Sequence, residues 1–192
     1  SSFTLHILAM LFMLCDHLWA TLFPEAEWLN CIGRLAFPIF AFMIAEGYSH
    51  TSNVKKYVLR LLICAVITEV PFDLFYGGMA FYPFHQNVLW TFLIALLAII
   101  LIEKARKLKK RVLGWVLAAV IVLVSYAVGT LAMVDYYGAG VLTVLVFYFF
   151  RERKWQNFAA QFVCLTSDEN KALICFGDSI TAQSWPDYLL IR

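Results

Sequence analysis

The sequence predicts an all-α protein: a polytopic bundle of about six transmembrane helices with a short β-turn-α tail of soluble type. Hydrophobic residues make up 62% of the 192 residues, charged residues make up 15%, and the mean hydropathy is +0.77. A soluble domain carries about 25% charged residues, and disorder requires low hydrophobicity, so both classes are excluded. The formal charge of +2 gives no indication of a nucleic-acid partner, and the partner that composition predicts is the lipid bilayer.

Six apolar segments account for the predicted helices, since a helix needs about 20 residues to cross the hydrocarbon core. In chain order they cover residues 3–23, 29–45, 57–75, 88–102, 112–133 and 138–150. The fourth and sixth are short, so we expect them to recruit flanking residues or to lie in a thinned region of the membrane. Pro38 and Pro71 are expected to kink the second and third helices, which membrane helices tolerate.

The basic residues indicate the orientation of the predicted bundle. Most of the fifteen Lys and Arg residues fall in the second and fourth connections and after the sixth segment. The first, third and fifth connections carry Glu25, Glu27 and Asp135 but neither Lys nor Arg. By the positive-inside rule, the N-terminus is expected in the cytoplasm.

Ionisable and polar side chains recur in the outward-facing half of the predicted helices. A charge at the bilayer centre costs at least about 2.5–3.5 kcal/mol, so such groups are functional candidates. One alternative is structural, in which Arg34 pairs with a carboxylate only to fix helix packing. We expect the bundle to gather these residues around one polar cavity: Asp16, His17, Arg34, Glu69, Asp73, His85, Gln86, Asn87 and Asp135.

A second polar set lies at the predicted inner end of the bundle. Glu46 needs a partner there, which His50, Lys55 or Lys56 could supply. The basic inner mouth would attract an anionic ligand such as a CoA thioester. The five cysteines show no C-x-x-C pair, and we predict neither a metal site nor a disulfide.

Five strings of the sequence, which together cover most of residues 1–150, resemble the TraX family of membrane proteins. They are LHILAMLFMLCDHLWATLF (5–23), IGRLAFPIFAFMIAEGYSHTSNVKKYVLRLLI (32–63), EVPFDL (69–74), QNVLWTFLI (86–94) and VDYYGAGVL (134–142). The family is named for a conjugation protein that acetylates the N-terminus of pilin, and it resembles transmembrane acyltransferases that use cytoplasmic acetyl-CoA. The resemblance implies a bacterial inner-membrane acetyltransferase with acetyl-CoA as donor. The acceptor stays open between peptide, glycan and lipid.

The resemblance also implies roles for the polar residues. Acyl transfer needs a general base, and His17 is the candidate because histidine titrates near neutral pH. Asp16 does not face His17 on a helix, so Glu69 or Asp73 is expected to orient the imidazole, while Arg34 would stabilise an oxyanion or hold a carboxylate. We expect the acceptor to meet His85, Gln86, Asn87 and Asp135, and the CoA end to meet Glu46, His50, Lys55 and Lys56.

The tail carries a second resemblance. The string KALICFGDSITAQSWPDYL (171–189) is similar to the opening of an SGNH (GDSL-like) hydrolase, with Gly177, Asp178 and Ser179 at the nucleophile turn. The sequence lacks the rest of that domain, and a nucleophile without its base is inactive. We therefore predict an incomplete TraX-like membrane domain over residues 1–154, a linker over 155–170 and a truncated hydrolase-like segment over 171–192.

Three other functions remain open from the sequence. The chain could be a transporter or channel in which Asp16, Glu69 and Asp73 carry protons or cations. It could be a structural membrane subunit whose charges only lock the helices together. It could also be a fragment of a fused esterase. CoA-dependent acyl transfer would indicate the acyltransferase, proton-coupled flux the transporter, and loss of stability without a separable activity the structural subunit.

Overall fold

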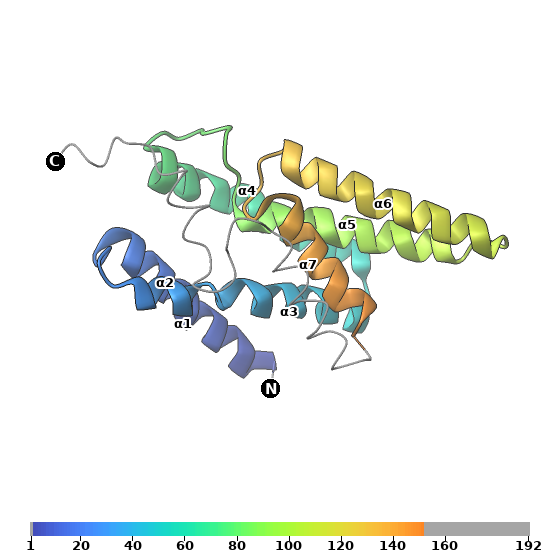
Figure 1. Cartoon of the computed structure of the whole chain (residues 1–192), viewed down its shortest axis with the longest axis horizontal. Helices are drawn as coiled ribbons and strands as arrows, with labels where there is room; N and C mark the ends of the chain where they lie inside the picture. The colour runs from blue at the N-terminus through green and yellow to red at the C-terminus, as the bar shows by residue number, and fades with distance from the viewer. Residues whose placement is uncertain (1, 152–192) are drawn as a thin grey trace. The chain divides into compact units, whose positions relative to one another are not determined.

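The computed structural model describes residues 2–151 as seven α-helices with no β-strand in that range (Figure 1). They are α1 (Ser2–Thr21), α2 (Glu27–Gly33), α3 (Ala36–His50), α4 (Val54–Gly77), α5 (Val88–Arg106), α6 (Arg111–Leu131) and α7 (Tyr137–Phe149). The described residues form two compact units, 2–43 and 44–151, and α3 begins in the first and ends in the second. The all-α prediction is confirmed. The predicted tail over 171–192, with Gly177, Asp178 and Ser179, lies outside the described residues.

The six predicted segments correspond to seven helices because the second segment is broken. The break falls at Arg34 and Leu35, between α2 and α3, rather than at Pro38. Pro38 is the third residue of α3, where its missing N–H would have no helical partner in any case. Pro71 lies inside α4, which continues through it to Gly77.

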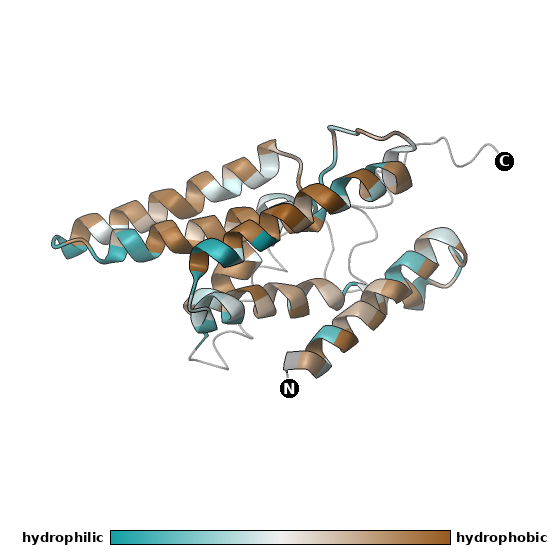
Figure 2. Cartoon of the chain, turned by 180° about the vertical axis from the view of Figure 1, so that it is seen from behind, coloured by the Kyte–Doolittle hydropathy of each residue, from teal (hydrophilic) through white to brown (hydrophobic). Residues whose placement is uncertain are grey.

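Four stretches of the described chain are long and apolar enough to cross a membrane: Phe3–Thr21, Glu27–His50, Val88–Arg106 and Arg111–Leu131. The apolar α7 is shorter, and α4 carries Arg60, Glu69 and Asp73 along its 24 residues. Hydrophobic residues line α5 and α6 over their length, and polar residues gather at the turn that joins them (Figure 2). Large apolar side chains exposed along α1 and α6 are typical of a surface that faces lipid. The chain is a membrane protein.

The first unit is a hairpin of α1 and α2 followed by the start of α3. Gly33 allows the close approach, since a β-carbon there would lie 2.7 Å from the Asp16 Cα. Small residues bring membrane helices together in this way. The contact places Asp16 against the end of α2.

The second unit is built around α5, which packs against α4, α6 and α7. Its core contains fully buried Phe92, Leu96 and Ile99 from α5. The face of α6 that is buried consists of small residues, namely Gly114, Ala118, Ser125 and Gly129. These small residues let the backbones of α5 and α7 approach α6 closely. The large apolar side chains of α6 lie on its other, exposed faces.

The turn between α6 and α7 has an unusual backbone. Met133, Tyr136 and Tyr137 all have positive φ values, of 50°, 62° and 47°, a region that costs side-chain-bearing residues of order 1–3 kcal/mol each. The turn is held by a bridge to the segment before α5: Gln86 N–H donates to the Met133 carbonyl, and Asp135 N–H donates to the Gln86 carbonyl, both at 3.0 Å. The bridge fixes Asp135 beside that segment.

Charge is segregated between two ends of the second unit. Every Lys and Arg of residues 44–151 lies where α3, α5 and α7 end and α4 and α6 begin, which we call the basic end. The opposite end holds the end of α4, residues 78–87 and the α6–α7 turn, and we call it the polar end. Its carboxylates are Glu69, Asp73 and Asp135, and within this unit it has no Lys or Arg. This pattern agrees with the spacing of basic residues in the sequence.

Candidate functional site

Glu69 is the best-bonded carboxylate of the polar end. Its Oε2 accepts hydrogen bonds from Trp90 Nε1 at 2.7 Å and from Asn87 Nδ2 at 2.5 Å. Its Oε1 is buried and has no hydrogen-bond partner among the described residues. Asn87 is itself buried, and its Nδ2 also reaches the Ala65 carbonyl and the Thr68 hydroxyl on α4. Asn87 therefore joins α4 to the start of α5 and holds one oxygen of Glu69 in place.

Asp73 lies one turn further along α4 and is 1% exposed. Its Oδ2 accepts a hydrogen bond from the Tyr82 backbone N–H at 3.0 Å, and within residues 2–151 its Oδ1 has no hydrogen-bond partner. Glu69 and Asp73 thus share one face of α4, as their spacing predicts, and each presents one unpartnered oxygen. Buried carboxylate oxygens without donors are costly, so these two atoms mark the polar end as a candidate binding site.

His85 and Asp135 form the third part of the polar end. His85 is 6% exposed, stacks on Phe72 with ring centroids 5.7 Å apart, and has its Nε2 3.7 Å from Asp135 Oδ1. The Asp135 carbonyl accepts a hydrogen bond from the Thr91 hydroxyl. The second unit thus brings together five predicted site residues, Glu69, Asp73, His85, Asn87 and Asp135, and includes Gln86 through its backbone. We call these six residues the polar cluster.

Burial gives His85 a testable pH dependence. Burial lowers the pKa of His85, although the Asp135 carboxylate lies 3.7 Å from its Nε2. The folded protein therefore binds fewer protons at His85 than the unfolded chain does. This contribution to stability is complete above the ordinary histidine pKa near 6.5 and is lost as the pH falls through that value toward the lowered pKa.

We expect the melting temperature of the purified protein in detergent to fall between pH 7.5 and pH 5.5, and to fall less in His85→Gln. Glutamine keeps a polar side chain of similar length but does not titrate. Equal losses in both proteins would show that His85 is not the group responsible.

Asn87 gives a prediction for the cluster's stability. In Asn87→Asp the side chain can still accept from Leu89 N–H, as Asn87 Oδ1 does at 2.9 Å, but its donors are lost and a carboxylate faces Glu69. We expect a loss of about 1–3 kcal/mol, measured as a lower melting temperature. Asn53→Asp is the matched control, because Asn53 also caps a helix, accepts from Lys56 N–H and is exposed. Equal effects of the two changes would contradict the assignment.

The first unit contains a second polar group. Arg34 Nε donates to Asn30 Oδ1 at 3.1 Å and lies 3.8 Å from Asp16 Oδ1. Asn30 is 1% exposed and the Arg34 side chain 12%. Within this unit, Asp16 is the carboxylate that Arg34 approaches. The pair fixes α1 against the start of the second apolar segment.

His17 lies on a different face of α1 from Asp16, as expected for adjacent helical residues. Asp16 is half-buried toward α2, whereas His17 is exposed. The Thr21 hydroxyl bonds the His17 carbonyl at 2.7 Å. The imidazole is therefore exposed on the surface of α1, whereas its neighbour Asp16 pairs with Arg34. Orientation of His17 by Glu69 or Asp73 stays a prediction.

The predicted donor-end residues lie at the basic end. Glu46 has His50 Nδ1 at 3.4 Å and Arg151 Nε at 3.8 Å from its carboxylate oxygens. His50 is thus a partner as predicted, and Arg151 takes the place considered for Lys55 and Lys56, which lie in the first turn of α4. A role for these residues in binding CoA stays a prediction.

Several contacts were not foreseen from the sequence. Asn30 stands four residues before Arg34, a spacing at which helical side chains meet, and this signal could have found it. Trp90 and Tyr82 contact the predicted carboxylates, but aromatic residues are common in this chain and carry no such signal. Glu103 accepts a hydrogen bond from the Tyr148 hydroxyl at 2.5 Å, and these two residues are 45 positions apart.

Comparison with known proteins identifies the family. The family described as "TraX protein" matches residues 1–189 of the chain. The chain belongs to the TraX family. The match also runs across residues 171–189, and the resemblance of that string to SGNH hydrolases finds no support in the comparisons. No solved structure matches the chain.

A curated protein resembles part of this TraX-family chain. It is the "Probable fimbrial assembly protein FimC, serogroup H1" of Dichelobacter nodosus, 32% identical over 112 residues. The similar region covers 53% of this chain and 46% of that protein, so the chain spans about half the length of the curated relative that it matches. The relative's printed name connects it with fimbrial assembly.

Proposed function

We propose that this TraX-family protein is a membrane acyltransferase that moves an acetyl group from cytoplasmic acetyl-CoA to an acceptor. The observation that carries the proposal is the exposed His17 on an apolar helix whose neighbouring Asp16 pairs with Arg34. A histidine in a membrane helix is costly and functional by default. The position of His17, together with membership of the TraX family, supports a role for this residue in proton transfer.

The chemistry assigned to His17 is that of a general base. The imidazole takes a proton from the acceptor as the acceptor's nitrogen or oxygen attacks the thioester carbonyl carbon. The carbon–sulfur bond then breaks, the acetyl group stays on the acceptor, and CoA leaves as a thiolate that recovers the proton. An imidazole suits both steps because its ring nitrogen can accept a proton and later give it up.

The separation of charge in the second unit supports the direction of the proposed reaction. A basic end attracts an anionic donor, and the positive-inside rule places that end in the cytoplasm. The acceptor would then be met at the opposite side of a bacterial inner membrane, where the polar cluster offers Gln86 and Asp135, which are less buried than His85 and Asn87. The N-terminus is cytoplasmic in this arrangement.

The relative's name supports one class of acceptor. That relative is named as a probable fimbrial assembly protein, and the family resemblance implies pilin as an acceptor. We propose a pilin-like peptide as the first acceptor to test, ahead of glycans and lipids.

The experiment that tests the proposed function is acetyl transfer by the purified protein in membranes. Wild-type protein is incubated with acetyl-labelled CoA and membrane extract, and label is followed into protein, glycan and lipid fractions. We expect label in the protein fraction, at a rate that depends on the amount of transferase. Release of acetate alone, or no turnover of acetyl-CoA, would overturn the proposal.

A transporter is the second candidate, favoured by the unpartnered Glu69 Oε1 and Asp73 Oδ1. Buried carboxylates of this kind can carry protons or cations. Proton flux into proteoliposomes that needs both carboxylates and no CoA would favour this function. Flux unchanged in Asp73→Asn would exclude it.

A further inference from the structure

A cavity of about 300 Å³ lies at the basic end, where α5 ends and α6 begins. Arg106, Arg111, Gly114 and Trp115 line it. Thus two guanidinium groups and an indole ring surround one open space. The predicted site residues include none of these four.

The backbone brings the two arginines to the same cavity. Lys107 N–H and Leu108 N–H bond the Lys104 and Ala105 carbonyls, which closes the end of α5 into a tight turn. Gly114 lets α6 approach that turn, because a β-carbon there would lie 2.8 Å from the Ala105 carbonyl oxygen. A larger residue at 114 would push the two helix ends apart and separate Arg106 from Arg111.

The Arg106 guanidinium is positioned by its neighbours. Its Cζ lies 5.5 Å from the centroid of the Trp115 ring, and its Nη1 lies 3.5 Å from Glu103 Oε1. The Tyr148 hydroxyl bonds the same oxygen of Glu103. An arginine held in this way presents its planar fork at little further entropic cost, which suits recognition of phosphate.

The start of α6 adds to the positive field of the cavity. Arg111 is its first residue, the preceding Lys110 makes no side-chain cap, and the first turn has no acidic residue. The amides of a first helical turn lack helical acceptors and favour anions. Two arginines and a helix N-terminus therefore act on the same space.

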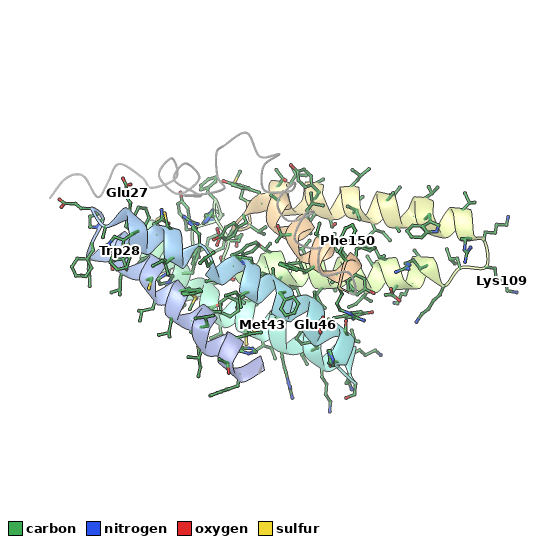
Figure 3. All side chains as sticks on the ribbon, turned by 60° about the horizontal axis from the view of Figure 1, so that its bottom comes forward. Glu27, Trp28, Met43, Glu46, Lys109 and Phe150 are labelled. Carbon is green, nitrogen blue, oxygen red and sulfur yellow. The ribbon has the colours of Figure 1, made fainter. Side chains whose placement is uncertain are left out.

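We propose that this cavity binds the phosphate groups of an anionic ligand, with Arg106 and Arg111 as the clamp. Phosphates of this kind belong to CoA or to an anionic lipid headgroup. The assignment to CoA as acyl donor rests on the proposed function, whereas phosphate binding does not. The alternative is that these arginines only anchor the helix ends at the membrane surface, a role that needs no cavity. The lysines at the tip of the α5–α6 hairpin, such as Lys109 in Figure 3, are placed to serve as such anchors.

The test measures binding by the purified full chain in phosphatidylcholine nanodiscs at physiological salt. The probes are CoA, inorganic pyrophosphate and pantetheine, which lacks phosphate. We expect CoA and pyrophosphate to bind and pantetheine not to bind. The double variant Arg106→Gln/Arg111→Gln should weaken the binding of CoA at least about tenfold, because each charge-assisted hydrogen bond to phosphate is strong. The control variant Lys107→Gln/Lys109→Gln removes the same amount of charge and should change the affinity for CoA less than about twofold.

A second arm distinguishes the source of the phosphate. If the soluble probes do not bind but native mass spectrometry shows phosphatidylglycerol retained by wild type and lost in the arginine variant, the phosphate clamp stands and its ligand is a lipid. The proposal is overturned if the lysine and arginine variants lose phosphate binding equally. It is also overturned if the wild type binds neither the soluble phosphate probes nor phosphatidylglycerol. CoA binding without acetyl transfer would instead count against the proposed function and leave the clamp intact.

Discussion

His17→Ala should abolish acetyl transfer and leave the membrane domain folded. A general base contributes about 10²–10⁴-fold to the rate, and alanine can take no proton from the acceptor. Because His17 is exposed and its neighbour Asp16 makes the contact with Arg34, the packing of α1 on α2 should survive the change. The measurement is label transferred per folded molecule, with folded protein counted by size-exclusion chromatography.

His85→Gln is the matched control for this experiment. His85 is a histidine of the same chain, but it is buried against Phe72 and Asp135, where an acceptor cannot reach it without movement of the polar end. We expect His85→Gln to retain most of its transfer activity at pH 7.5. Loss of activity in His85→Gln with full activity in His17→Ala would move the role of base to His85.

Gly138→Ala should destabilise the second unit by about 1–3 kcal/mol or more, the range for forcing extra atoms into a packed site. A β-carbon at 138 would lie 2.6 Å from the Tyr126 carbonyl oxygen and 2.7 Å from the Thr130 Oγ1. The first atom belongs to the backbone of α6 and cannot rotate away. The start of α7 would have to separate from α6, next to the strained turn at Tyr136 and Tyr137.

Thermal unfolding in detergent measures this effect, together with the fraction of protein recovered as a single size-exclusion peak. Ala127→Val is the control, because it adds carbon to an exposed position of the same α6 and should leave both readouts close to wild type. A melting temperature of Gly138→Ala equal to that of the control would show that α6 and α7 are not packed as closely as described.

The sequence by itself predicted the helices well because membrane segments obey a simple physical constraint. A span must be apolar over about 20 residues and satisfy its own backbone hydrogen bonds. The apolar length can be read from the sequence, and the helical conformation follows from the lipid environment. The short fourth segment, predicted to recruit flanking residues, extends as α5 to Arg106. The break of the second segment at Arg34 carries no proline, the residue that most often interrupts a helix, whereas Pro38 lies in the first turn of α3, which accommodates it.

Part of the candidate site could also be predicted from the sequence. Charged residues are expensive in lipid, so Asp16, Arg34, Glu69 and Asp73 stood out from their apolar surroundings, and helical spacing put Glu69 and Asp73 on one face. The choice of Asp16 as the partner of Arg34 depended on the approach of α2 to α1 at Gly33. Convergence of that pair with the polar cluster stays a prediction.

Hydropathy and charge spacing therefore determined which segments enter the membrane and at which end the cations lie. The tertiary structure decided which polar atoms meet. Asn87 reaches Glu69, Arg106 is held over Trp115, and Asp135 is bridged to Gln86. The two residues of each pair are well separated in the sequence. Their contacts depend on how closely small residues let the helices approach. That distance is a property of packing and leaves no period in the sequence.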